Sequence, residues 1–359
     1  MFWPSGAFLG LKSLHLGHVC GASLTTRYIL EVLSANPELE TLTLKKNAIQ
    51  YNPSDMELPQ VVLPCLRNLD YMPDHGFAID QTLRHITLLP NSIKNLSITD
   101  SEDVSEQANN RYEDFLTTVL ISLAPTLGRL HERCGGSYLH FYPATQQNKA
   151  QFSWDSQLED LRLRIYIPEI SPSIALQWVG GVLCLAKPGI TMTVHEESLS
   201  GDVVRSMQSM QCVEQLLVYN FPISALARAQ QLLDALGGSS AASPDSPISA
   251  PFPSLHTSKL AGWEMGLDPI INMVHKRFSE ASGLDPANRV PDLSLDISLW
   301  DWVWTRCYGP DSIWTLAVVQ GIRAMPGVKG VRLGQVSDAF GAGILAVVWD
   351  EELMAPVWG

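Results

Sequence analysis

Residues 39–47, LETLTLKKN, have leucines at positions 39, 42 and 44 and end at Asn47, so the stretch fits L-x-x-L-x-L-x-x-N. Apolar and polar side chains alternate along most of it, which is typical of a β-strand with one buried face. The same pattern begins at Leu11, Leu66 and Ile93, which places successive copies 28, 27 and 27 residues apart. A three-position apolar pattern arises by chance in a chain rich in aliphatic residues, but regular spacing predicts an internal repeat.

Further copies of the pattern follow at looser steps of 26 to 39 residues. They begin at Leu127, Leu158, Lys187, Val213, Phe252, Val290 and Val328. Proline precedes many copies and cannot continue a helix. Helix-like stretches lie ahead of several of these prolines, at residues 25–35, 79–89 and 112–123. The repeating unit is therefore predicted to be a strand, a turn, a helix and a proline.

One such unit cannot bury its own apolar face, but stacked units can. The sequence therefore predicts an α/β fold of the leucine-rich-repeat solenoid type, with a curved parallel β-sheet on the concave side and helices on the convex side. Residues between the leucines would face the concave surface. We expect a partner to bind there, at Thr41, Thr43, Asp70, Arg162, Arg164 and Tyr219, since Arg and Tyr are enriched among interface hot spots.

Three parts of the chain differ in composition. The repeat array is expected to fill residues 1–236. Residues 237–253, GGSSAASPDSPISAPFP, read as a flexible loop with Ser-Pro dipeptides at 243–244 and 246–247 that a proline-directed kinase could use. The array is expected to continue through residues 254–359 and to end in Trp-rich repeats and a cap.

Tryptophan is concentrated in this last part, at alternate positions Trp300, Trp302 and Trp304 and then at Trp314. This spacing predicts one face of a strand packed under a helix; an exposed aromatic patch for a partner is the alternative. Residues 343–349, GILAVVW, are expected to form the last strand before a polar cap.

The run at residues 11–47, together with LPCLRNLDY at 63–71 and LPNSIKNLSITD at 89–100, resembles the leucine-rich region of fungal F-box-type proteins. In that family an F-box module docks onto the adaptor of a cullin-RING ubiquitin ligase, and the repeats select the substrate. The resemblance therefore implies a protein partner that is a ubiquitination substrate. Because the repeats start at Leu11, no room is left for an F-box of about 40 to 50 residues. We expect a truncated product or a recognition half without the docking half.

Charge and composition exclude other classes of partner. The formal net charge of -13 argues against nucleic acid, whose phosphates need clustered Lys and Arg. Six scattered cysteines without CxxC pairs, no signal peptide and no apolar run of about 18 residues predict an intracellular protein, cytoplasmic or nuclear, with no membrane partner. We expect a monomer.

Catalytic motifs fail simple checks, so no cofactor or metal is expected. Gly341–Ala346 fits G-x-G-x-x-A, but too few residues follow for a dinucleotide-binding unit. His195-Glu196-Glu197 and His131–Cys134 lack metal-site spacing. Asn95-Leu96-Ser97 is a formal glycosylation sequon within an expected strand. A protein-recognition module is favoured over an enzyme with a pocket in the Trp-rich region, or a degenerate fragment without a partner.

Overall fold

The computed structural model describes residues 8–17, 24–45, 49–50, 58–72, 82–99, 121–143, 150–183, 189–210, 212–221, 223–238, 252–264, 266–281, 291–300, 313–337, 344–350 and 355–358. The chain divides into unit 1, Met1–Pro188, and unit 2, Gly189–Gly359. Each unit contains a β-sheet accompanied by helices, so the expected mixed α/β class is confirmed. Most of the loop expected at 237–253 lies outside the described residues, and its flexibility stays a prediction.

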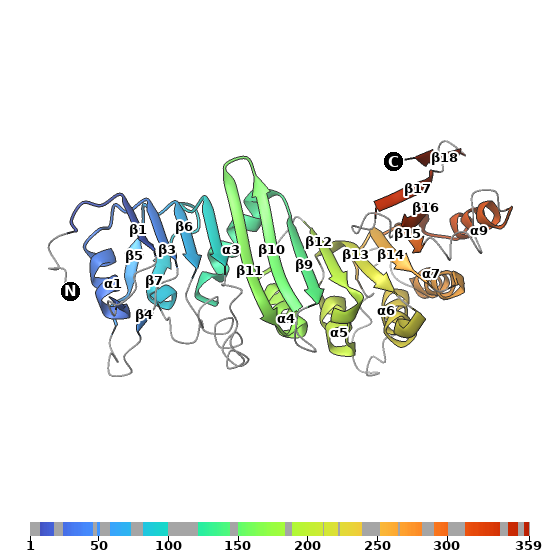
Figure 1. Ribbon diagram of the computed structural model, residues 1–359, viewed down its shortest axis with the longest axis horizontal. Helices are drawn as coiled ribbons and strands as arrows, with labels where there is room; N and C mark the ends of the chain where they lie inside the picture. Colours follow the sequence, from blue (N-terminus) through green and yellow to red (C-terminus); the bar gives the residue numbers. More distant parts are fainter. Residues whose placement is uncertain are drawn as a thin grey trace. The chain divides into compact units, whose positions relative to one another are not determined.

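The sheet of unit 1 begins with five parallel strands that lie side by side (Figure 1). In spatial order they are β1 (Ser13–Gly17), β3 (Thr41–Lys45), β6 (Asn68–Met72), β8 (Asn95–Thr99) and β11 (Leu161–Ile170). Next to β11 come β10 (Ala150–Leu158) and β9 (Ser137–Pro143), each antiparallel to its neighbour. The expectation of a purely parallel sheet is therefore wrong for this part of unit 1.

The repeat pattern sets the register of the parallel strands. The second leucine position of the first four copies pairs in one row, Leu14, Leu42, Leu69 and Leu96, and Leu163 of β11 continues this row. The third position forms the next row, Leu16, Leu44, Tyr71 and Ile98, and Ile165 of β11 continues this row. All of these side chains except Leu16 are buried. Because alternate residues of a strand point to opposite faces, the two rows form the covered side of the sheet.

Helix α1 (Thr26–Ser34) confirms the helix expected at residues 25–35. The Thr25 hydroxyl caps it by accepting a hydrogen bond of 3.2 Å from the Tyr28 N–H. Ile29, Leu30 and Leu33 are buried on one face, as the spacing of apolar residues predicts.

The remaining elements of unit 1 are short strands and helices. The strands form two pairs, β2 (Leu24–Thr25) with β4 (Ile49–Gln50), and β5 (Val61–Leu63) with β7 (Ile86–Leu88). The helices are the 3-10 turn η1 (Thr82–His85), α3 (Ile121–Cys134) and α4 (Pro172–Leu183).

Two of the expected elements in unit 1 are wrong. The copy expected at Leu127 lies inside α3, where Leu127 and Leu130 are both buried. Leucines three residues apart also share one face of a helix, so this pattern fits both structures. The helix expected over residues 79–89 is instead η1 followed by strand β7. Most of the helix expected over 112–123 lies outside the described residues.

The copy expected at Leu158, LEDLRL, is a hairpin. Leu158 ends β10 and pairs with Leu161, which begins β11, so only Glu159 and Asp160 form the turn. Glu159 has a positive φ of 49°, the backbone conformation that two-residue hairpin turns require. The parallel register therefore resumes at β11, where Arg162 pairs with Asn95.

The strands of unit 2 begin with five parallel ones, β12 (Ile190–His195), β13 (Val213–Phe221), β14 (Thr257–Trp263), β15 (Leu293–Trp300) and β16 (Val328–Ser337). Each begins at or just after an expected copy of the pattern. Two antiparallel strands follow, β17 (Ile344–Asp350) and β18 (Ala355–Trp358). The strand expected at 343–349 is therefore present, but it is followed by another. Trp302 and Trp304 lie outside the described residues.

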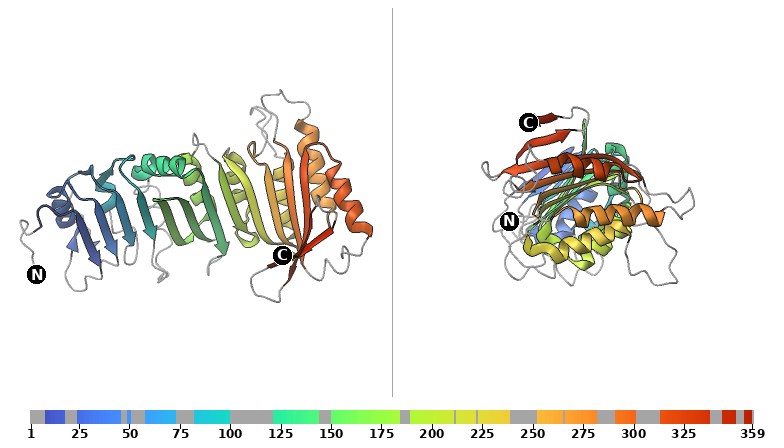
Figure 2. Two further views of the ribbon diagram at one scale, coloured as in Figure 1. Left: turned by 90° about the horizontal axis from the view of Figure 1, so that it is seen from above. Right: turned by 90° about the vertical axis from the view of Figure 1, so that its right-hand side faces the viewer.

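Helices connect the parallel strands of unit 2, and α6 (Leu226–Gly237) lies beside α7 (Asp268–Ala281) on one face of the sheet (Figure 2). The other helical segments are η4 (Glu196–Ser198), α5 (Gly201–Ser209), η5 (Ile223–Ala225) and α9 (Ile313–Arg323). Arg277 of α7 is buried and donates hydrogen bonds to the carbonyls of Leu236, Phe252 and Leu255 at 3.1, 3.2 and 3.3 Å. It therefore links α6, α7 and the segment that leads into β14.

Candidate functional site

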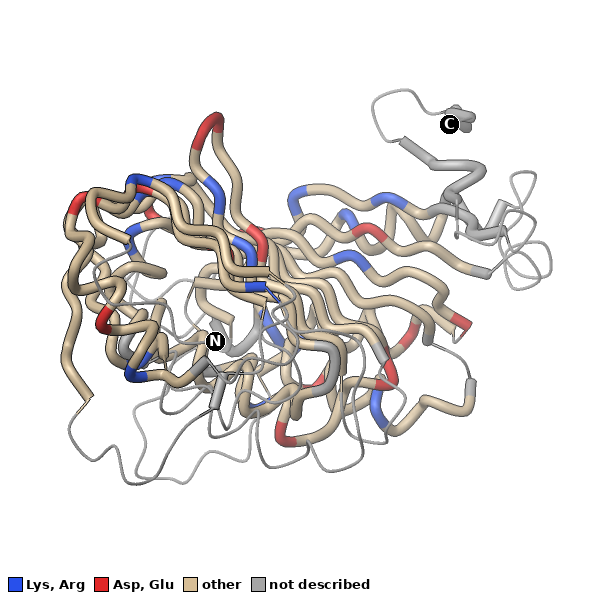
Figure 3. The backbone as a smooth tube through the Cα atoms, turned by 60° about the vertical axis from the view of Figure 1, so that its left-hand side comes forward, with Lys and Arg blue, Asp and Glu red and all other residues tan. Residues whose placement is uncertain are grey.

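The side of the unit-1 sheet opposite the leucine rows carries polar and aromatic side chains, and we call it the unit-1 open face. It comprises Ser13, His15, Thr41, Thr43, Lys45, Asn68, Asp70, Asn95, Ser97, Tyr138, His140, Tyr142, Ser153, Asp155, Arg162, Arg164 and Tyr166. All of them except Thr43 are half-buried or exposed. Basic and acidic positions are interspersed along these strands (Figure 3).

Five of the six expected site residues belong to this surface. Thr41 and Arg162 lie in one row of the register, while Thr43, Asp70 and Arg164 lie in the next. Tyr219 is instead in β13 of unit 2, where its side chain is exposed. The residues therefore form one group of five in unit 1 and one separate tyrosine.

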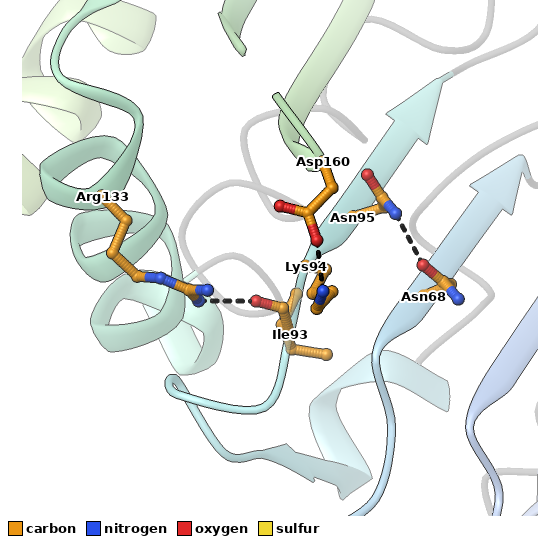
Figure 4. A network of polar contacts seen from close by, with 6 residues as sticks. All are labelled: Asn68, Ile93, Lys94, Asn95, Arg133 and Asp160. Carbon is orange, nitrogen blue, oxygen red and sulfur yellow. Dashed lines mark hydrogen bonds and ion pairs between the residues drawn. The ribbon is translucent and has the colours of Figure 1, made fainter. Parts of the chain in front are cut away.

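A ladder of hydrogen bonds crosses three strands of the open face. The Asn95 amide nitrogen donates to the Asn68 amide oxygen at 2.6 Å (Figure 4). The Asn68 amide nitrogen in turn donates to the Thr41 hydroxyl at 3.2 Å. Each bond restricts side-chain rotation, so these polar groups are presented in a fixed orientation.

Ion pairs hold several of the charged side chains of the open face. Lys45 Nζ lies 2.6 Å from Asp70 Oδ2, and Arg164 Nε donates to Asp155 Oδ1 at 2.9 Å. The Ser153 hydroxyl also donates to Asp155. Arg164 and Asp155 are directly opposite each other on β11 and β10, so the guanidinium is fixed close to the sheet.

The ends of the strands add a second polar network, shown in Figure 4. Lys94 donates to the carboxylate of Asp160, and this hydrogen bond holds the pKa of that carboxyl below its ordinary value. Arg133 of α3 donates to the Ile93 carbonyl at 2.8 Å. The network therefore joins α3, the start of β8 and the β10–β11 turn.

Strand β9 adds an aromatic column formed by Tyr138, His140 and Tyr142. Successive ring centroids are 6.5 and 6.0 Å apart, and the rings are nearly parallel, at 7° and 9°. The tyrosines are 55% and 43% exposed, large values for aromatic side chains. Burial lowers the pKa of His140, and the nearby Asp155 opposes that shift only in part.

The aromatic column was not among the expected site residues. Its signal is nevertheless present in the sequence SYLHFYP, where exposed Tyr138, half-buried His140 and exposed Tyr142 alternate with buried Leu139 and Phe141. This stretch lies between two copies of the repeat pattern, so a search for that pattern passes over it.

In unit 2 the corresponding side of the sheet carries Lys259, Asp296 and Arg332 in one row of the register. Lys259 Nζ lies 3.8 Å from Asp296 Oδ2. Burial raises the pKa of Asp296, although Lys259 and Arg332 favour its charged form. Tyr219 lies on β13 one strand before Lys259.

The possible metal ligands serve packing and capping. Glu196 is buried and paired with Arg228, and His195 caps η4 by accepting a hydrogen bond from the Glu197 N–H. His131 is buried with its Nδ1 2.6 Å from the Ser137 hydroxyl. Within the part of the chain that the structure describes, no three His, Cys, Asp or Glu residues are grouped so that they could hold a metal ion.

No helix in the described ranges is both long enough and apolar enough to cross a membrane. Comparisons of the chain with protein-family models, curated proteins and solved structures found no significant match.

Proposed function

We propose that this protein is a recognition module of the leucine-rich-repeat solenoid type, which binds a protein partner through the unit-1 open face. The observation that carries the proposal is the register of β1, β3, β6, β8 and β11. It buries the repeat leucines in rows and leaves the residues between them on the other side of the sheet. Repeat arrays use extended surfaces of this kind to bind other proteins.

Side-chain chemistry supports a protein as the partner. Tyr138 and Tyr142 on β9 and Arg164 on β11 are exposed on the open face, on either side of β10. Tyr and Arg contribute a large share of the binding energy in protein interfaces, because they combine apolar area with hydrogen-bonding groups. The fixed amide ladder and the Arg164–Asp155 pair would contribute orientation and specificity around them.

The resemblance to fungal F-box-type proteins supports a finer proposal. The partner would be a substrate that the repeats select for ubiquitination, and the chain would act by binding, without a catalytic step. The resemblance covers roughly residues 8–100, and the open face begins within that range and continues through β9 to β11.

The test is quantitative affinity capture from a lysate of cells that express the protein, followed by mass spectrometry. Three chains are compared: the wild type, the double variant Tyr138→Ser/Tyr142→Ser, and the control Val62→Ser/Leu89→Ser. The control removes two exposed apolar side chains of unit 1 that are 52% and 41% exposed and lie off the open face. Circular dichroism first establishes that all three are folded.

We expect the tyrosine variant to retain its partners about tenfold less well, as the loss of hot-spot side chains predicts, and the control to behave like the wild type. Equal retention by all three chains would contradict recognition through this face. Co-recovery of a cullin or its adaptor would support the ubiquitin-ligase proposal, and recovery of other proteins alone would support a stand-alone binding module.

A further inference from the structure

The charges at one end of the unit-1 strands do not balance. Directly before the first row of the open face lies a strand-start row, consisting of Lys12, Glu40, Arg67 and Lys94. Backbone hydrogen bonds join its members in order. The Glu40 N–H donates to the Lys12 carbonyl at 2.8 Å, the Arg67 N–H to the Glu40 carbonyl at 2.9 Å, and the Lys94 N–H to the Arg67 carbonyl at 2.8 Å. The Arg162 N–H continues the series by donating to the Lys94 carbonyl at 2.9 Å.

Acidic partners neutralise the lysines of this end. Lys12 lies 3.8 Å from Glu40, and Lys94 is paired with Asp160. Arg67 and Arg162 are both exposed, and neither forms an ion pair with another residue that the structure describes. Two guanidinium groups are therefore left uncompensated in a chain whose formal net charge is -13.

The two arginines lie on the same stretch of sheet. Arg67 directly precedes β6, Arg162 is in β11, and only β8 separates these strands. Adjacent strands are about 4.8 Å apart, so the two backbones are roughly 10 Å apart. The half-buried amide ladder of Asn68 and Asn95 lies on β6 and β8 (Figure 4).

We propose that Arg67 and Arg162 bind an anionic segment of the protein partner, whose carboxylate or phosphate groups cross the strand starts of unit 1. Guanidinium groups bind both kinds of anion through paired charge-assisted hydrogen bonds. A segment in the polyproline II conformation has three residues per turn and rises about 3.1 Å per residue, so anionic side chains three residues apart lie on one side, about 9 Å apart, close to the spacing of the two arginines. This inference rests on the proposed function and adds the chemistry of the partner.

A nucleic acid is a poorer match for the same charges. Its affinity depends on many neutralised phosphates along the backbone, whereas this patch offers two uncompensated arginines. The negative net charge of the chain also repels a long polyanion. A short peptide with two or three negative groups avoids most of that repulsion.

The test measures fluorescence anisotropy of the full chain with four labelled probes. Three are 12-residue peptide libraries, degenerate except at two positions three residues apart, which hold Glu, phosphoserine or Gln. The fourth is a 15-nucleotide dT oligonucleotide. Binding is compared among the wild type, Arg67→Glu/Arg162→Glu, and Arg84→Glu. Arg84 is an exposed arginine of η1, so its variant controls for reversing one positive charge elsewhere on unit 1.

We expect the wild type to bind the Glu or the phosphoserine library about tenfold more tightly than the Gln library, as loss of a charge-assisted hydrogen bond predicts. The double variant should lose this preference, and Arg84→Glu should keep it. A preference for Glu alone or phosphoserine alone identifies which anion is bound. Equal binding of all libraries, unchanged binding by the double variant, or tightest binding of the oligonucleotide would overturn the inference.

Because these probes are synthetic, the result is independent of the lysate experiment. Dependence of cellular partners on Tyr138 and Tyr142 without any peptide preference would leave the proposed function standing and reject the anionic segment. A peptide preference without partners that depend on the tyrosines would reject the proposed function instead.

Discussion

In unit 2, the guanidinium of Arg277 is 3% exposed and donates hydrogen bonds to three carbonyls from two other segments of the chain. Burial lowers its pKa to about 10, so the group still carries its charge at neutral pH. Arg277→Met would leave three carbonyl oxygens without this donor. We expect the free energy of unfolding to fall by about 3 kcal/mol, as measured by urea denaturation.

Lys276 provides the matched control, because it is the next residue and also bonds a partner on α6. Its ammonium lies 3.1 Å from Asp234, but both side chains are largely exposed. Exposed pairs contribute about 0 to 1 kcal/mol. If Lys276→Met costs as much as Arg277→Met, the three buried carbonyl contacts are not the source of the effect.

His140 couples the aromatic column to pH. Its folded-state pKa is lowered by burial from an ordinary value of 6.5, so the unfolded chain takes up a proton at a higher pH than the folded chain does. Stability from this residue is therefore present above pH 6.5 and is lost as the pH falls through that value. We expect His140→Phe, which keeps a ring between the two tyrosines, to lose less stability between pH 7 and pH 5 than the wild type.

Thermal unfolding across this pH range checks the prediction, with His275→Phe on an exposed face of α7 as the control. His140 Nδ1 is buried and has no hydrogen-bond partner among the described residues, so replacing this nitrogen breaks no hydrogen bond to them. The same loss of stability in wild type and His140→Phe would show that another group causes the pH dependence.

At the scale of elements, Asn36 connects α1 to the segment that leads into β1. Its amide nitrogen donates to the carbonyls of Phe8 and Val32 at 2.6 and 2.7 Å, and its oxygen accepts from the Leu11 N–H at 2.8 Å. The side chain is buried. Asn36→Ala would leave all three backbone groups without this partner, so we expect a loss of about 2 to 3 kcal/mol.

Hydrogen exchange locates the effect. Relative to the wild type, the Asn36→Ala variant should exchange the amides of β1 faster and those of β6 at nearly the same rate. Asn36→Asp keeps the acceptor for Leu11 but places a buried carboxylate against the carbonyls of Phe8 and Val32, so it should cost at least as much as Asn36→Ala. Equal exchange rates in β1 of all three chains would contradict a role of Asn36 in holding this strand.

How well the sequence predicts an element depends on whether one local pattern specifies it. Strands β1, β3, β6 and β8 and their register follow from L-x-x-L-x-L, since period-two alternation and constant spacing agree there. At Leu127 the first two leucines also fit one face of a helix, and α3 formed. The hairpin at Glu159–Asp160 lacks the Asn-Gly or Asp-Gly pair that marks such turns, so antiparallel pairing could not be predicted.

The candidate site was predicted in the same uneven way. Thr41, Thr43 and Asp70 were expected on one face because regular copies of the pattern fix their register. Arg162 and Arg164 were expected on that face as well, and the strand after the hairpin carries them there. Tyr138 and Tyr142 belong to β9, whose place beside β10 depends on long-range pairing that no local pattern reports.

At the scale of the whole molecule, a regular array and an irregular insertion together form the unit-1 open face. Asn95 and Arg162 are neighbours in the register although 67 residues separate them in the chain. Within that interval lie α3, β9 and β10, which supply Arg133, the aromatic column and Asp155. The insertion thus supplies the two tyrosines proposed as hot spots, and the regular strands supply the amide ladder. The Arg164–Asp155 pair joins the two parts.

Hydroxyl-radical footprinting of the full chain, with and without a captured partner, tests recognition through this face most directly. We expect the partner to lower the oxidation of Tyr138 and Tyr142, which are 55% and 43% exposed when the chain is free. Oxidation of Val62 in unit 1 and Leu226 in unit 2, at 52% and 53% exposure, should stay unchanged. Unchanged oxidation of both tyrosines in the presence of a bound partner would contradict recognition through the unit-1 open face.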